Sequence, residues 1–160
     1  MTEYPGFIAV ETGDDNALPL AIAWALPNGQ IKHTLIQPDD EWLNDELLSL
    51  GGYDLDELRH LGVSPLDVLR ELENDHFSET LYTAGVQDDE AALSLMFDDF
   101  GVDPFVELAP AENLYPELDA GDWSRARSEL FGEMGLEPLR PEHEVQVMLY
   151  LHQRLVQRDE

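Results

Sequence analysis

The chain has 160 residues, of which 43% are hydrophobic, and it contains no cysteine. This length suits one domain with a hydrophobic core, and the missing cysteine excludes disulfides, a thiol nucleophile and thiolate metal ligands. No apolar run approaches the roughly 18 residues of a membrane span, and residues 1–5 contain no basic or signal-like region. We therefore expect one cytoplasmic domain over residues 1–160, with no membrane partner.

The charge is extreme, because 35 acidic residues against eight basic ones give a formal net charge of −27. Adaptation to a salty cytoplasm is the favoured interpretation, since at ~1 M salt the Debye length is only ~3 Å and self-repulsion is screened. The alternatives are a merely acidic protein and a DNA-mimicking decoy. Acids spread along the whole chain suit a solvated surface better than a mimic patch.

The negative net charge also affects which partners the chain is expected to bind. Nucleic-acid affinity normally comes from Lys and Arg side chains that release counterions, and the chain has no basic stretch. Nucleic acid is therefore a disfavoured partner, and a protein partner stays open. The sequence does not determine the oligomeric state.

The first third of the chain predicts three antiparallel strands. Residues 6–11 and 19–26 are nearly continuous apolar segments, and residues 31–37 alternate between apolar and polar side chains. Pro27, Asn28 and Gly29 favour a tight turn between the second and third strands.

The remainder predicts helices that alternate with short strands. A first helix follows Asp39 and ends at Gly51-Gly52, and Ser64 caps a helix that begins at Pro65. Further helices are expected at 54–60, 65–74, 88–100, 122–134 and 141–157, and strands at 79–83 and 105–108. Strands first and then alternating strands and helices predict a mixed-sheet α/β domain.

Four segments carry a family resemblance. They are Ala9-Val10-Glu11-Thr12-Gly13 at the end of the first strand, residues 58–65, residues 81–89, and His143 at the start of the last helix. Their order and spacing, over nearly the whole chain, resemble the Asp-Glu-Asp-Asp (DEDD) family of 3′–5′ exonucleases in the ribonuclease H-like superfamily. The resemblance implies a ribonuclease H-like fold, with a five-stranded mixed sheet, antiparallel meander first, flanked by helices.

The resemblance also implies a metal site. Glu11 and Asp89 match ligands of Mg²⁺ or Mn²⁺, with Asp88, Asp14 and Asp15 as alternative ligands, and His143 matches the general base. Two-metal cleavage needs several carboxylates around ions ~3.5–4 Å apart.

Two of the family's aspartates are missing. Ala9 stands two residues before Glu11, and Met148 stands five residues after His143. We therefore expect an eroded site, which holds a metal ion weakly or not at all, and a vestigial role for His143.

Three functions follow. The first is an exonuclease-like protein, inactive or weakly active, that binds nucleic acid or protein. The second is an active Mg²⁺- or Mn²⁺-dependent 3′–5′ exonuclease with relocated carboxylates, for which Glu142 and Glu144 are available beside His143. The third is an acidic protein-interaction module. Without a metal site, Asp88 and Asp89 would only cap a helix, and His143 would be an ordinary surface residue.

Overall fold

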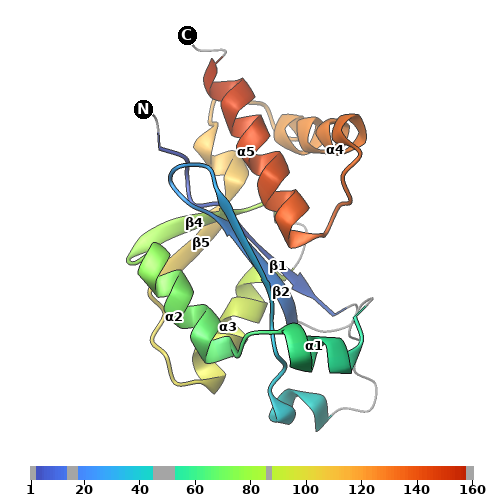
Figure 1. Cartoon of the computed structure of the whole chain (residues 1–160). Helices are drawn as coiled ribbons and strands as arrows, with labels where there is room; N and C mark the ends of the chain where they lie inside the picture. Colours follow the sequence, from blue (N-terminus) through green and yellow to red (C-terminus); the bar gives the residue numbers. More distant parts are fainter. Residues whose placement is uncertain (1–2, 14–17, 45–52, 86–87, 158–160) are drawn as a thin grey trace.

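The structure is a computed structural model that describes residues 3–13, 18–44, 53–85 and 88–157. It is an α/β protein in which strands form the middle and helices lie on either side (Figure 1). The strands are β1 (Ile8–Thr12), β2 (Pro19–Ala25), β3 (Ile31–Leu35), β4 (Glu79–Thr83) and β5 (Val106–Pro110). The α-helices are α1 (Leu55–Leu61), α2 (Pro65–Asp75), α3 (Asp89–Asp99), α4 (Asp122–Met134) and α5 (Pro141–Gln157). Two short 3₁₀ helices are η1 (Asp40–Asn44) and η2 (Ala111–Leu114).

The predicted antiparallel meander is confirmed. β1 pairs with β2 so that Ala9 lies opposite Ala23, and β2 pairs with β3 so that Ala23 lies opposite His33. The turn contains Gly29 at φ 89°, a conformation that glycine adopts without strain. The side chain of Asn28 accepts a hydrogen bond from the Gln30 backbone N–H at 3.0 Å and so stabilises the turn.

The strands form two sheets where one mixed sheet was expected. β4 and β5 make a parallel pair, and one bridge between Phe7 and Tyr82 joins this pair to the edge of β1. The Tyr82 N–H donates to the Gly6 carbonyl at 2.9 Å. Further along β1, the N–H of Val10 donates to the side chain of Asp89, which stands where a neighbouring strand would continue.

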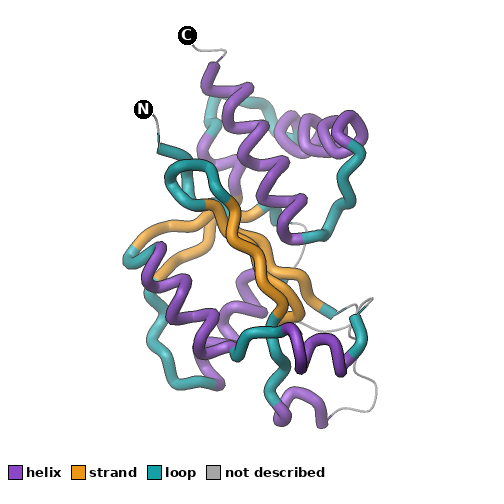
Figure 2. The backbone as a smooth tube through the Cα atoms, viewed as in Figure 1, coloured by secondary structure: helices purple, strands orange, loops and turns teal. Residues whose placement is uncertain are grey.

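The two faces of β1 and β2 bury different sets of apolar side chains, because successive residues of a strand point to opposite faces. Ile8, Val10 and Trp24 belong to the cluster that includes α2 and α3. Phe7, Ala9 and residues of α4 and α5 form the second cluster. Figure 2 shows the resulting arrangement, with strands between two groups of helices.

The element predictions agree with the structure to within a few residues except after β3. There the expected α-helix begins instead as the 3₁₀ helix η1, in which Trp42 donates a hydrogen bond to Asp99. Leu47, Leu48 and the Gly51-Gly52 stop lie outside the described residues. The helix η2 was not expected.

Two histidines join distant elements. His76 is buried, with Nε2 2.8 Å from the Ala25 carbonyl and Nδ1 2.7 Å from the Glu79 carboxylate. His152 has Nδ1 2.9 Å from the Tyr115 hydroxyl. These contacts link strands and helices that are far apart in sequence.

In the described part of the chain, no helix has the length and hydropathy needed to cross a bilayer.

Candidate functional site

The candidate site lies where β1 ends and α5 begins. Glu11 is the next-to-last residue of β1 and is half-buried on the same strand face as Ala9. Its carboxylate accepts a hydrogen bond from the Tyr53 hydroxyl at 2.6 Å. Burial raises the pKa of Glu11, and the hydrogen bond from Tyr53 opposes this shift.

Three further charged or titratable side chains act on Glu11. Arg140 and His33 lower the pKa of Glu11, and Glu142 raises it. Nε2 of His33, on β3, lies 3.1 Å from Oε2 of Glu142, on α5. The alignment of these two atoms is not that of a hydrogen bond, so the buried Oε2 atom has no hydrogen-bond partner among the described residues.

Asp89 is the first residue of α3 and is 5% exposed. Its Oδ1 accepts a hydrogen bond from the Val10 N–H at 2.7 Å. Phe7 accepts a backbone hydrogen bond from Ala25 on β2, so alternate residues of β1, including Val10, direct their N–H to the opposite edge. The carboxylate of Asp89 therefore satisfies a strand edge that β4 leaves unpaired.

Burial raises the pKa of Asp89 to about 7, against a usual value of 3.8. The hydrogen bond from Val10 favours the ionised form, while the negative charges of Glu144 and Asp88 disfavour it. A carboxylate in this position titrates near neutral pH, which is a common property of functional sites and also of buried structural acids.

Of the three alternative ligands, the structure describes Asp88 alone. Asp88 is exposed and precedes α3, and its side chain makes no capping hydrogen bond. Asp14 and Asp15 lie outside the described residues.

His143 contacts the connection between α4 and α5. Its Nδ1 accepts a hydrogen bond from the Glu137 N–H at 3.0 Å. Its neighbours diverge, because Glu142 lies beside His33 and Glu144 contacts Arg127. The start of α5 thus directs three consecutive side chains to three different partners.

The ion pair between Arg127 and Glu144 was not predicted from the sequence. Glu144 is 2% exposed, and its Oε1 accepts a hydrogen bond from Arg127 Nε at 3.0 Å. Its Oε2 accepts from Arg127 Nη2 and, at 2.8 Å, from the Leu139 N–H. The guanidinium carbon of Arg127 lies 4.8 Å from the ring centroid of Phe131. Glu144 is therefore fully engaged in holding α4 against α5.

Ala9 and Met148 lie in one buried apolar cluster between β1 and α5. Ala9 is 7% exposed and Met148 is 1% exposed. These are the two positions at which the exonuclease resemblance predicts an aspartate. In this chain both side chains, a methyl group and a thioether, pack against apolar neighbours.

The described residues do not fit a two-metal centre. Among them, no group of three or more His, Asp or Glu side chains is arranged to hold a metal ion. Glu11 is paired with Tyr53, and Asp89 is occupied by the backbone of β1. What the site offers chemically is two separate carboxyl groups of raised pKa, with His33 and Arg140 beside the first of them.

No family model matches this chain, and the curated proteins contain no significant match.

Proposed function

We propose that this chain is a ribonuclease H-like domain that has lost two-metal catalysis and functions by binding. The arrangement of strands supports the fold: a three-stranded meander, then a parallel pair beside β1, with helices on both faces. This is the order that the resemblance to the DEDD exonucleases implies.

One observation supports the proposed loss of catalysis. Ala9 and Met148 share a buried apolar cluster, so the two missing carboxylates are replaced by packed core. Two divalent ions ~3.5–4 Å apart repel each other and need several carboxylates to hold them. Glu11 and Asp89 alone supply too little charge, and each already has a hydrogen-bond donor.

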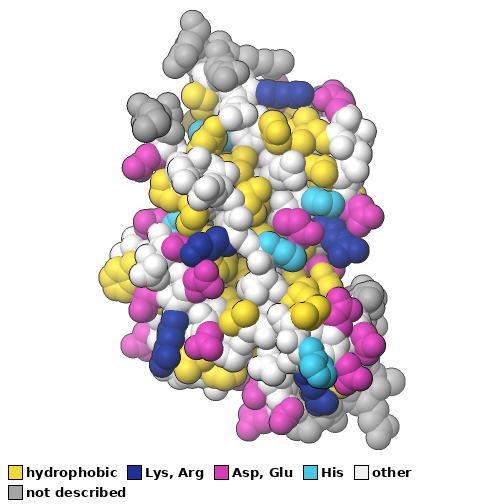
Figure 3. Space-filling view, viewed as in Figure 1, with side chains coloured by type: hydrophobic (Ala, Val, Ile, Leu, Met, Phe, Trp, Pro, Cys, Tyr) yellow, Lys and Arg dark blue, Asp and Glu magenta, His cyan; other side chains and the backbone are white. Residues whose placement is uncertain are grey.

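The charge favours a protein as the partner. A net charge of −27 repels phosphates, and the eight basic residues form no basic stretch from which counterions would be released on phosphate binding. Figure 3 shows acidic side chains distributed over the visible face, with few basic ones among them. A protein with a basic surface is the complementary partner.

A second candidate is an active exonuclease with relocated carboxylates. It is favoured by the group around Glu11, in which Glu142 has a buried oxygen atom without a hydrogen-bond partner among the described residues. A carboxylate oxygen in this state is a potential ligand for a cation.

The deciding assay uses end-labelled single-stranded DNA and RNA with Mn²⁺ at molar salt. We expect no shortening of either substrate by the wild-type chain or by Glu11→Gln. Shortening by the wild type that disappears in Glu11→Gln would establish the second candidate. Metal-free anisotropy with the same oligonucleotides, expected to detect no binding at physiological salt, tests the preference for a protein partner.

A further inference from the structure

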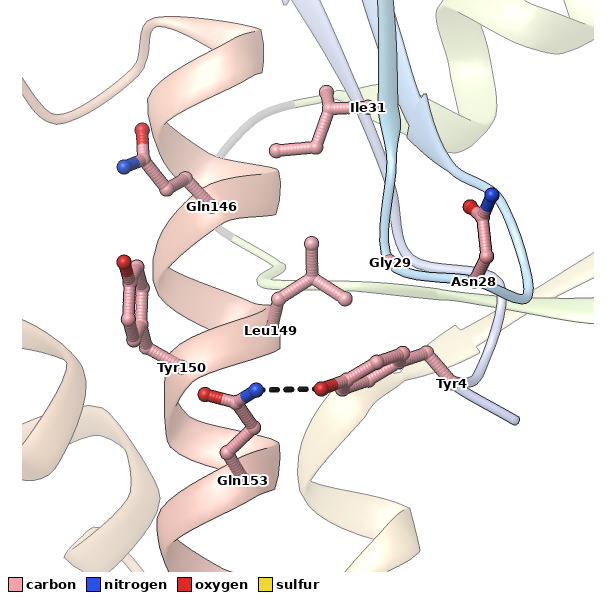
Figure 4. Close-up of a pocket in the computed structure, with 8 residues that line it drawn as sticks. All are labelled: Tyr4, Asn28, Gly29, Ile31, Gln146, Leu149, Tyr150 and Gln153. Carbon is pink, nitrogen blue, oxygen red and sulfur yellow. Dashed lines mark hydrogen bonds between the residues drawn. The ribbon is translucent and has the colours of Figure 1, made fainter. Parts of the chain in front are cut away.

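A pocket of about 420 Å³ lies away from the site described above, between the β2–β3 turn and the outer face of α5. Such a volume is in the usual range for small-molecule sites, which is about 300–1,000 Å³. Its walls come from segments distant in sequence: Tyr4, the turn at Asn28 and Gly29, and α5 between Gln146 and Gln153. Figure 4 shows Leu149, Gln153 and Tyr4 between the helix and the turn, and Gln146 and Tyr150 on the other side of the helix in this view.

The pocket is uncharged, which is unusual for this protein. The chain has 27% charged residues, yet none of the residues that line the pocket is Asp, Glu, Lys or Arg. An anionic ligand would meet no cation there and would be repelled by the whole molecule. A cationic ligand would find stronger partners elsewhere on the acidic surface. The lining therefore selects for a neutral ligand.

The rim of the pocket carries free hydrogen-bonding groups. The amide of Gln146 and the hydroxyl of Tyr150 have no hydrogen-bond partner among the described residues, and each can both donate and accept. Asn28 uses its Oδ1 to accept from Gln30, which leaves its NH₂ group available. Gln153 donates to the Tyr4 hydroxyl, and this contact closes one end of the pocket (Figure 4).

Apolar side chains occupy the middle. Leu149 and Ile31 lie between the polar groups of the helix and those of the turn (Figure 4). The complementary ligand has an apolar face and a periphery of groups that both donate and accept hydrogen bonds. A pyranose ring has this form, because its C–H groups make the faces and its hydroxyls make the edge.

We propose that this pocket binds a neutral saccharide. A nucleobase shares part of the chemistry, but in a nucleic acid it brings phosphates toward a chain of net charge −27. A free nucleoside avoids that cost, so it is included in the test as the competing ligand.

The experiment begins with the labelled full chain on an array of neutral oligosaccharides, followed by calorimetry with the best-bound disaccharide. Adenosine and uridine are titrated in parallel. The variants are Gln146→Ala and Tyr150→Ala, which remove rim groups. Val156→Ala is the control, because Val156 is exposed on the same helix and does not line the pocket. Circular dichroism checks that each variant is folded.

We expect a disaccharide to bind and each rim variant to weaken it about threefold to tenfold, as the loss of one hydrogen bond implies. Val156→Ala is expected to bind like the wild type. The proposal is overturned if no saccharide binds, if both rim variants bind as tightly as the wild type, or if a nucleoside binds in place of every saccharide.

Discussion

At the scale of single residues, the two predicted metal ligands, Glu11 and Asp89, have structural partners. Asp89 accepts the N–H of Val10, and Glu11 accepts the hydroxyl of Tyr53. Both carboxyl groups have raised pKa values because burial disfavours their ionised forms. Ionisation of such a group at neutral pH costs free energy unless a cation is present. The pH dependence of stability therefore distinguishes a structural acid from a metal ligand.

Asp89→Asn provides a test through the pH dependence of stability. The folded-state pKa of about 7 is above the usual 3.8, so the contribution of protonated Asp89 is fully present below pH 3.8. It is lost as the pH rises through about 7, and it amounts to at most ~4 kcal/mol at ~1.4 kcal/mol per pKa unit. Asn keeps an oxygen for Val10 and does not ionise.

We expect the free energy of unfolding of the wild type to fall between pH 4 and 8 by more than that of Asp89→Asn. Chemical denaturation at several pH values, in molar salt, measures the difference. Parallel curves for the two proteins would show that Asp89 does not titrate in this range.

At the scale of elements, the connection between α1 and α2 depends on one glycine. Val63 pairs with the end of β3, because its N–H donates to the Leu35 carbonyl and its carbonyl accepts from Gln37. A Cβ atom on Gly62 would lie 2.3 Å from the Leu58 carbonyl oxygen and 2.6 Å from the Gln37 nitrogen. Both contacts are with backbone, so neither can be relieved by a side-chain rotation.

Gly62→Ala is expected to reduce the free energy of unfolding by about 1–3 kcal/mol, as overpacking does. Gly132→Ala is the matched control: Gly132 lies within α4 and has nothing within 4 Å of its added Cβ. There the greater helix propensity of alanine is expected to add about 0.5–1 kcal/mol. Urea denaturation of both variants measures the change in the free energy of unfolding. Equal changes for the two substitutions would contradict this interpretation of Gly62.

The elements themselves were largely predictable from the sequence. The near-continuous apolar residues of β2, the Asn28-Gly29 turn and Ser64 before Pro65 are local signals, and each was found where expected. The helix after β3 was less predictable, because a 3₁₀ helix and an α-helix share the same acidic start and apolar spacing.

The site was less predictable because its contacts are not local. Tyr53 reaches Glu11, Val10 reaches Asp89, and Arg127 reaches Glu144 across long stretches of sequence. The adjacent positions of Glu142, His143 and Glu144 give no indication that their side chains diverge. The sequence shows that Ala9 and Met148 stand where the exonuclease resemblance predicts aspartates. Only the structure shows that these two residues pack into one cluster.

At the scale of the whole molecule, the net charge of −27 dominates. Self-repulsion destabilises the compact state, and salt screens it, because the Debye length falls from about 10 Å at 0.1 M to about 3 Å at 1 M. Described cations such as Lys32, which contacts Glu71 and Asp75, are too few to neutralise the surface.

We expect the Tm to rise by on the order of 10 °C between 0.1 M and molar NaCl, which corresponds to about 3 kcal/mol for a domain of this size. A thermal melt followed by circular dichroism at several salt concentrations gives the answer. A Tm that stays constant across this range would rule out salt adaptation as the reason for the acidic surface.

We propose that the ribonuclease H-like fold of this chain persists while its metal centre does not. Calorimetric titration of Mn²⁺ at molar salt tests this claim most directly, because high salt suppresses diffuse binding of cations to the acidic surface. We predict no discrete Mn²⁺ site, either in the wild type or in Glu11→Ala. A stoichiometric site in the wild type that Glu11→Ala abolishes would contradict the claim.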